Sequence, residues 1–194
     1  MDPLIAKLVV LAGIIASIFI RLPHHRRSTQ NVIVSHRKNG REKALLAVVS
    51  IGMMVLPVLY IFTGWPAFAD YGFEPLAGWA GLGVMALAMW LFWKCHADLG
   101  RNWSPTLEVR EGHTLVTGGV YRHIRHPMYT SIWLWSLAQL LLLPNAIVGP
   151  AAIMAFGLMY LLRVDHEEGL MLERFGDDYR SYMGRTRRII PGFL

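Results

Sequence analysis

The chain has 194 residues, of which 54% are hydrophobic and only 16% are charged. This composition is too apolar for an ordinary soluble domain and is typical of an integral membrane protein. A formal net charge of +6 also occurs in nucleic-acid-binding proteins, but here the basic residues flank apolar runs, which indicates contact with anionic lipid instead. The single cysteine, Cys95, excludes an internal disulfide framework.

Three apolar runs in the first half of the chain predict membrane-spanning helices at residues 3–20, 44–64 and 75–93. Each is close to the roughly 20 residues that a helix needs to cross a bilayer. Pro57 inside the second run is compatible with this, because neighbouring helices accommodate a proline kink. In the third run, Ala77 and Gly81 have the spacing of small residues that lets two helices approach closely.

A fourth apolar run, residues 129–162, contains no charged side chain. As one helix it would extend about 51 Å, well beyond a hydrocarbon core about 30 Å thick. Pro144 and Asn145 lie in its middle, so the run divides into a fourth and a fifth span joined by a tight hairpin. We therefore expect an all-α integral membrane protein with five transmembrane helices, the last two forming a short helical hairpin.

The distribution of Lys and Arg predicts the orientation. Residues 21–43 hold seven of them and residues 94–125 hold five, whereas residues 65–74 and the Pro144 hairpin hold none. Because basic loops stay on the cytoplasmic side, we expect both basic loops and the C-terminus in the cytoplasm and the N-terminus outside. The first basic loop also contains three histidines, but without a cluster of acids or cysteines we expect no metal site there.

Residues 94–125 form the longest polar segment. Two short extended pieces are predicted in it, at residues 107–109 and 115–117, around a turn. The segment leads into G-G-V-Y-R-H-I-R-H-P, residues 118–127, where Pro127 suits the first turn of a helix because its missing N–H needs no partner there. Cationic and aromatic side chains are thus expected at the mouth of the fourth span.

The end of the fifth span carries a second group of charges. Arg163 and Glu167 are four residues apart and so share one helical face. A charged cap of a membrane helix explains this spacing as well as a functional site does. The predicted orientation favours a site, because it places these residues on the same side of the membrane as residues 118–127. Gly176 is expected to end this helix, and a short C-terminal helix bearing tyrosines is expected after it.

An ordered set of motifs runs through the second half of the chain. It comprises H-T-L-V-T-G-G-V-Y at 113–121, R-H-P at 125–127, and then Tyr129, Arg163, Glu167, Glu168, Phe175, Gly176, Tyr179, Tyr182 and Pro191. R-H-P alone is a weak signal, but the ordered set in a membrane context is specific. It resembles the isoprenylcysteine carboxyl methyltransferase family and its phospholipid methyltransferase relatives.

The resemblance implies S-adenosylmethionine as methyl donor, with S-adenosylhomocysteine as product, bound without a Rossmann domain. The chain agrees, because it offers no glycine fingerprint between a strand and a helix. The implied cofactor-binding residues, with His126 foremost, are His113, Leu115, Val116, Gly118, Gly119, Tyr121, Arg125, His126, Pro127, Tyr129, Glu168, Tyr179 and Tyr182. For each tyrosine taken singly, anchoring at the membrane interface is the alternative interpretation.

Methylation of a carboxylate is an in-line displacement at the sulfonium methyl group. The carboxylate is already ionised near neutral pH, because its reference pKa is about 3.5. No general base is then needed, and catalysis comes from orientation and desolvation. We expect Arg163 to hold the acceptor carboxylate through a bidentate ion pair. Glu167 would orient Arg163 or stabilise the cationic donor.

The sequence predicts a single domain, in which residues 1–93 provide the first three spans and residues 94–194 the cofactor-binding and catalytic part. This second part is expected to include the last two spans, a small cytoplasmic cofactor-binding region and a C-terminal helix. The preferred acceptor is the C-terminal carboxylate of a prenylated cysteine, presented as a small molecule or a peptide among membrane lipids, with no nucleic-acid partner. A phospholipid N-methyltransferase is the first alternative, and there Glu167 would remove a proton from the amine. The others are a membrane reductase of the sterol type and a non-enzymatic scaffold or transporter, which would leave the polar cluster near Arg163 unexplained.

Overall fold

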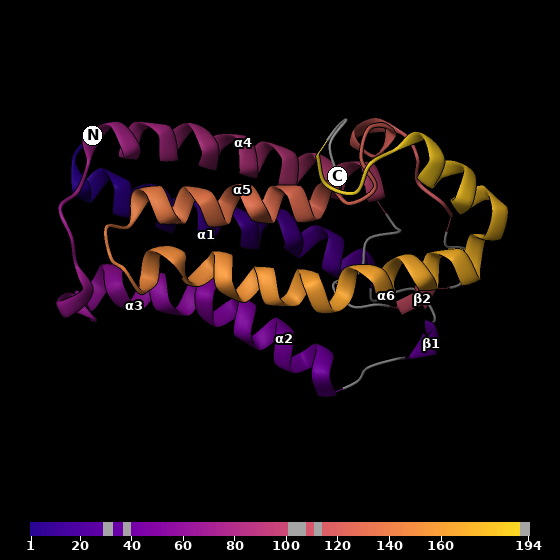
Figure 1. Cartoon of the computed structure of the whole chain (residues 1–194), viewed down its shortest axis with the longest axis horizontal. Helices are drawn as coiled ribbons and strands as arrows, with labels where there is room; N and C mark the ends of the chain where they lie inside the picture. The colour runs from indigo at the N-terminus through magenta and orange to yellow at the C-terminus, as the bar shows by residue number, and fades with distance from the viewer. Residues whose placement is uncertain (29–32, 37–39, 101–107, 111–113, 191–194) are drawn as a thin grey trace.

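The computed structural model describes the whole chain except residues 29–32, 37–39, 101–107, 111–113 and 191–194. Helices dominate the architecture (Figure 1). The elements in chain order are α1 (Pro3–Ser28), β1 (Ile33–His36), α2 (Gly40–Ser50), the π-helix η1 (Ile51–Val55), α3 (Leu56–Thr63), the 3₁₀ turn η2 (Ala67–Ala69), α4 (Pro75–Leu99), β2 (Glu108–Arg110), the 3₁₀ turn η4 (Gly119–Arg122), α5 (Pro127–Leu142) and α6 (Val148–Arg185).

Four stretches of the described chain are long and apolar enough to cross a membrane: Pro3–Pro23, Gly40–Thr63, Pro75–Leu99 and Val148–Arg185. They contain four of the five spans predicted from the sequence. The remaining one, predicted after Tyr129, corresponds to α5, which has 16 residues and is therefore about 24 Å long. α5 nevertheless lies between α4 and α6 in the bundle and packs against both (Figure 1).

Several helix boundaries lie at or near the proline, asparagine and glycine residues that predicted them. Pro127 opens α5, as predicted. α5 ends before Leu143, and the buried Asn145 side chain accepts hydrogen bonds from the amides of Ile147 and Val148, so it closes the predicted hairpin and begins α6. Gly176 also interrupts α6 as predicted, because its φ of 50° lies outside the helical region and only glycine adopts it readily.

One departure concerns the small β-structure. The predicted extended piece at 107–109 is seen as β2, Glu108–Arg110, but it pairs antiparallel with β1, Ile33–His36, and not with residues 115–117. Residues 115–117 have no regular secondary structure. The hydrogen bonds of β2 therefore go to the first basic loop, a partner distant in sequence that turn signals within 94–125 do not reveal.

A π-helix interrupts the second span where it meets the hairpin. A π-turn leaves backbone carbonyls in non-α positions, and the buried Gln139 amide of α5 donates to the carbonyl of Gly52 at 3.0 Å and to that of Val148 at 2.8 Å. A Cβ atom on Gly52 would lie 2.8 Å from the Ala151 carbonyl oxygen, so this crossing of η1 and α6 requires glycine. Polar side chains bridging helices in this way stabilise bundles inside lipid.

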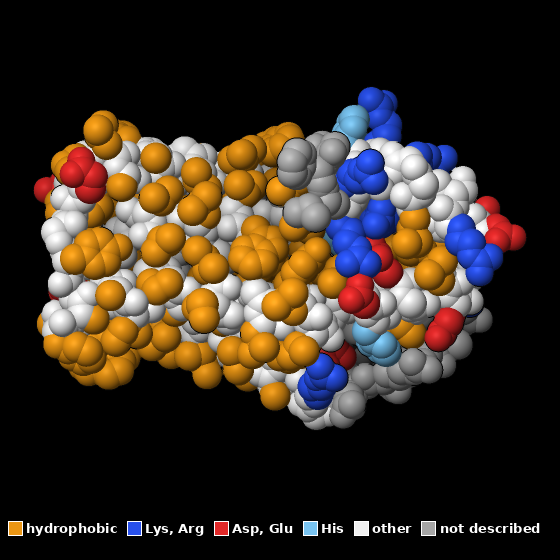
Figure 2. All heavy atoms as spheres, viewed as in Figure 1, with side chains coloured by type: hydrophobic (Ala, Val, Ile, Leu, Met, Phe, Trp, Pro, Cys, Tyr) orange, Lys and Arg blue, Asp and Glu red, His pale blue; other side chains and the backbone are white. Residues whose placement is uncertain are grey.

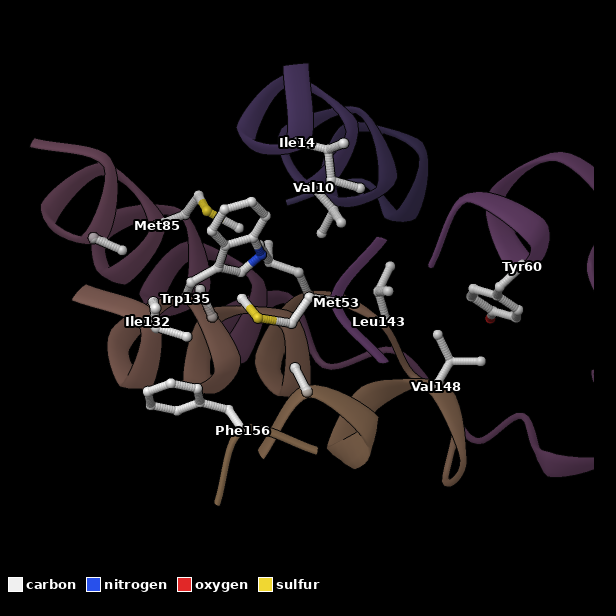
Figure 3. Packing of buried hydrophobic residues seen from close by; sticks show 14 of the residues in the cluster. Val10, Ile14, Met53, Tyr60, Met85, Ile132, Trp135, Leu143, Val148 and Phe156 are labelled. Atoms are coloured by element: carbon white, nitrogen blue, oxygen red, sulfur yellow. The ribbon is translucent and has the colours of Figure 1, made fainter. Parts of the chain in front are cut away.

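The core lies between the helices and is apolar. Val10 of α1, Met53 of η1 and Trp135 of α5 converge there, and Phe156 of α6 packs below them (Figure 3). The outward faces of the helices are apolar too, with large hydrophobic side chains such as Phe62 and Leu161 more than 70% exposed. Exposed apolar surface on every side of a helix bundle is what a lipid environment requires.

The contact between α4 and α5 yields a stability prediction. A Cβ atom on Gly81 would lie 2.8 Å from Leu142 Cγ, whereas nothing lies within 4 Å of the equivalent position at Gly83. We expect Gly81→Ala to lower the free energy of unfolding by about 1–3 kcal/mol through overpacking. Gly83→Ala is the control and should be neutral or slightly stabilising. Thermal unfolding in detergent measures both, and equal midpoints for the two variants would contradict the prediction.

Candidate active site

Charged side chains gather at one end of the bundle, around the second half of α6, while hydrophobic side chains cover most of the remaining face (Figure 2). The part of α6 before the break at Gly176 begins at Val148 and is about 42 Å long, so it extends beyond a hydrocarbon core of about 30 Å. Its apolar part ends at Leu162, and Arg163, Asp165, Glu167 and Glu168 follow within two turns. The candidate site therefore lies where the bundle leaves the apolar zone.

Glu168 is the centre of this end of the molecule. Its side chain is only 4% exposed and accepts hydrogen bonds from three cationic or basic side chains. Arg125 Nε lies 2.9 Å from Oε1 and His126 Nε2 lies 3.2 Å from the same atom. Arg188 reaches Oε2 through Nη2 at 2.7 Å and Nε at 3.1 Å. Such a group is stable when buried only because every charge has a partner.

The segment after α6 is fastened to the loop before α5 by backbone bonds. The amides of Arg125 and His126 donate to the carbonyls of Arg187 and Arg188 at 2.7 and 2.8 Å. Arg125 Nη1 also donates to the Thr186 carbonyl at 2.6 Å. The chain end thus adds a strand-like edge to residues 124–126, and Glu168 lies beneath the junction. Burial works to lower the pKa of Arg188, but its bonds to the carboxylates of Glu168 and Asp165 outweigh this and raise that pKa above its usual value.

Arg163 lies beside the Glu168 group, but its contacts with carboxylates are longer. Its side chain is 11% exposed, with Glu167 Oε2 3.4 Å from Nε and Glu42 Oε1 3.4 Å from Nη1. These distances exceed the 2.7–2.9 Å of good charge-assisted hydrogen bonds. The buried Nε has no hydrogen bond of suitable geometry among the described residues. Glu167 is held instead by the Tyr129 hydroxyl, which donates a short hydrogen bond to it. Arg163 therefore retains donor capacity.

His126 joins the two groups. Its imidazole is 7% exposed and stacks on the Tyr129 ring, with centroids 5.2 Å apart and an interplanar angle of 12°. Nε2 faces Glu168, and Nδ1 lies 3.9 Å from Glu167 Oε1. The His126 imidazole thus lies between two carboxylates. One belongs to Glu168, which is fully hydrogen-bonded, and the other to Glu167, which faces Arg163.

The loop before α5 is held by an acid on α4. Asp98 pairs with Lys94 at 2.9 Å and accepts the Val120 amide at 2.9 Å. Gly119 has φ of +58°, and a Cβ atom there would lie 2.0 Å from Asp98 Oδ2. Glycine is therefore needed at 119 for two reasons, its backbone conformation and the space that Asp98 occupies. The buried Tyr121 follows, and burial is the main cause that raises the pKa of its hydroxyl well above the usual value.

The structure brings most of the implied site residues together. Arg125, His126, Tyr129, Arg163, Glu167 and Glu168 lie in one connected group, and Pro127 starts the helix that carries Tyr129. Tyr182 donates to the Tyr121 carbonyl at 2.6 Å and its ring lies 5.9 Å from that of Tyr179. Leu115 and Val116 precede η4 without a hydrogen bond to the Glu168 group in the described part of the chain, and Gly118 accepts the Tyr121 amide. His113 lies outside the described residues.

Sequence reasoning did not single out Glu42, Asp98 or Arg188 as members of this end of the molecule. Glu42 reaches Arg163 across 121 positions of the chain, so no local spacing reveals it. Asp98 had a signal, because Lys94 stands one helical turn before it. Within the described residues, no group of three or more His, Cys, Asp or Glu side chains is placed to hold a metal ion.

The buried Glu168 group predicts a stability effect. Glu168→Gln leaves Arg125 and Arg188 facing an amide, and removal of one partner from a buried ion pair costs about 3–5 kcal/mol. We expect a lower midpoint of thermal unfolding and earlier proteolysis after Arg185. Asp177→Asn is the control, because its pair with Arg180 is largely exposed and surface pairs contribute little. A Glu168→Gln protein as stable as the control would contradict this assignment.

Comparison with known proteins shows which family the second half of the chain resembles. The family model described as isoprenylcysteine carboxyl methyltransferase (ICMT) matches residues 79–173. The protein-S-isoprenylcysteine O-methyltransferase of Dictyostelium discoideum is 34% identical over 89 residues, which are 44% of this chain and 36% of that protein. The Homo sapiens protein of the same name is 31% identical over 117 residues, 57% of this chain and 41% of that protein. The matched part thus spans less than half the length of these relatives.

A solved structure extends the similarity to the fold. It is the structure of a eukaryotic intramembrane Ras methyltransferase, ICMT, with 25% sequence identity and a TM-score of 0.55, covering 82% of this chain and 55% of that one. The residues matched by the family model run from α4 through α5 into the part of α6 that carries Arg163, Glu167 and Glu168. The chain therefore resembles the isoprenylcysteine carboxyl methyltransferase family across the segment that holds the candidate site, and it shares the fold of a solved member.

Proposed function

We propose that this protein transfers the methyl group of S-adenosylmethionine to the carboxylate of a prenylated cysteine or a similar lipophilic acid. The observation that carries the proposal is Arg163 at the end of an apolar helix, a nearly buried guanidinium whose Nε lies 3.4 Å from Glu167 but has no well-directed hydrogen bond among the described residues. The match of residues 79–173 to the isoprenylcysteine carboxyl methyltransferase family model supports methyl transfer. An arginine at this depth matches an acceptor whose tail lies in lipid and whose anionic end reaches the polar boundary.

The residues around His126 fit a sulfonium donor in their chemistry. The donor carries a positive sulfonium, an amino acid end and an adenine ring. Glu167 supplies a negative charge, and the stacked rings of His126 and Tyr129 supply aromatic surface that attracts cations. Arg125 and Glu168 already satisfy each other, so in this proposal they shape the donor site by holding the loop.

The reaction itself requires mainly that the protein hold the acceptor and the donor in the correct relative orientation. A carboxylate oxygen forms the new C–O bond as the bond from sulfur to the methyl group breaks, and the products are a neutral ester and the thioether. Arg163 would hold the acceptor oxygen in line, and Glu167 would keep the positive charge of the donor opposite it. Water exclusion by the surrounding apolar side chains strengthens both electrostatic contacts.

We propose that α5 also crosses the membrane, which gives five spans with the N-terminus outside and the C-terminus in the cytoplasm. The basic segments 21–43 and 94–125 and the five tail arginines then lie on one side. The opposite end carries the Pro144 hairpin and residues 65–74, which lack Lys and Arg. Methyl transfer would take place on the cytoplasmic side.

Replacement of Arg163 tests the acceptor role. We expect Arg163→Ala to reduce methyl transfer to a farnesylated N-acetylcysteine at least about 100-fold, because the acceptor loses its orientation, while donor binding measured by calorimetry remains detectable. Arg174→Ala, an exposed arginine farther along α6, is the control and should keep full activity. Wild-type turnover by Arg163→Ala would refute the assignment.

Replacement of His126 tests the donor role. We expect His126→Ala to weaken binding of S-adenosylmethionine about 3- to 30-fold, because it removes part of the aromatic surface proposed to attract the cationic donor. His123 lies exposed in the same loop, and His123→Ala should bind the donor normally. Calorimetry on both variants decides, and unchanged affinity in His126→Ala would count against a contact with the donor.

One observation favours a phospholipid amine as the alternative acceptor. Two carboxylates, Glu42 and Glu167, face the position of Arg163, and such groups could receive an amine proton. Radiolabelled methyl groups separate the two functions, because a carboxyl ester is labile to base and an N-methyl group is not. Base-stable label in phospholipid, without ester formation, would replace the proposed function by this one.

A further inference from the structure

Glu42 stands apart from its neighbours in the first basic segment. It is the sole acid in residues 21–43 and lies in the first turn of α2, where a carboxylate is favoured by the helix dipole. The dipole alone does not explain its environment, however. Arg41 and Lys43 on either side are exposed, whereas the Glu42 side chain is 12% exposed and lies 3.4 Å from Arg163 Nη1.

The two carboxylates near Arg163 approach different atoms of its guanidinium. Glu167, one turn later on the same helix, lies near Nε, and Glu42, from another helix, lies near Nη1. A planar guanidinium approached at two atoms has its orientation fixed. At 3.4 Å neither pair is a short hydrogen bond, so the five N–H donors of arginine are not used up.

The helix crossing sets the height of Glu42. α2 and η1 run toward the hairpin while α6 runs away from it (Figure 1), and the two meet where Gly52 approaches the Ala151 carbonyl. Glu42 precedes that crossing by about 15 Å of helix, and Arg163 follows it by about 18 Å. Because these two distances are nearly equal, the Glu42 and Arg163 side chains lie at about the same height along the bundle. The Gln139 bond to Gly52 holds the crossing in place.

We infer that Glu42 is a positioning residue for the reaction, which aims the Arg163 guanidinium at the acceptor carboxylate; the inference rests on the proposed function. Glu42 also supplies a second counter-charge. While the acceptor is anionic it competes with Glu42 and Glu167 for the guanidinium, and once it has become a neutral ester the two glutamates regain Arg163. The same contact thus favours alignment before the reaction and release after it.

The test uses the full-length protein in detergent with S-adenosylmethionine and a farnesylated N-acetylcysteine. We expect Glu42→Gln to lower kcat/KM for the acceptor by about 10- to 100-fold, with donor affinity by calorimetry and the unfolding midpoint close to wild type. Glu173→Gln is the matched control, because Glu173 is an exposed glutamate on α6. A purely structural role for Glu42 would lower the midpoint and the donor affinity along with activity.

Coupling to Arg163 is the decisive readout. If Glu42 acts through that side chain, the effect of Glu42→Gln should largely disappear in an Arg163→Lys background, since interacting residues are non-additive. Additive losses, or wild-type kcat/KM in Glu42→Gln, would overturn the inference alone. A wild-type protein that methylates no acid would overturn the proposed function and this inference with it. Should Glu42→Gln fail to fold, Glu42→Asp keeps the charge, withdraws it from Nη1 and undergoes the same comparison.

Discussion

The buried carboxylate of Glu168 is the interaction on which the polar end of this protein depends. It joins Arg125 and His126 from the loop before α5, Arg188 from the chain end, and α6 itself. Removal of the carboxylate would leave buried cations without a counter-charge, which costs far more than the loss of a surface pair. The backbone bonds between Arg125 and Arg187, and between His126 and Arg188, lie directly above it. One side chain therefore contacts three segments, and it joins the loop before α5 and the segment after α6 to α6 itself.

The contrast between Glu168 and Arg163 separates a residue that stabilises the fold from one that we propose to act in the reaction. Both oxygens of Glu168 accept hydrogen bonds, at 2.7 to 3.2 Å from Arg125, His126 and Arg188, which is the condition of a group that holds a fold. Arg163, at a similar depth, has two carboxylates at 3.4 Å and an Nε without a well-directed bond among the described residues. An incompletely satisfied buried cation is costly to a fold unless an anionic ligand completes it. This difference, more than the presence of charge, is the reason we propose Arg163 as the reactive part of the cluster.

Local signals explain what the sequence could predict. Apolar runs give the helices, Pro127 gives the start of α5, and Gly176 gives the break in α6, because each depends on a few adjacent residues. The pairing of Arg163 with Glu167 on one helical face could be predicted for the same reason. The pairing of β1 with β2, the π-helix at η1 and the approach of Glu42 to Arg163 depend on partners far along the chain. No single-sequence periodicity encodes such partners, and the length of α5 likewise follows from where the hairpin closes.

Charge balance explains why the two glutamates beside Arg163 need not exclude the anionic acceptor that we propose for this site. In a low-dielectric site, an unpaired guanidinium would bind a carboxylate strongly and would also pay a large desolvation cost in its free state. Glu42 and Glu167 lower that cost and weaken the grip on the acceptor at the same time. Tyr129 limits the charge that Glu167 can offer, because its hydroxyl already donates to that carboxylate. In the proposed reaction the two glutamates thus stabilise the guanidinium before the acceptor binds, and they allow the acid to leave once methylation has removed its charge.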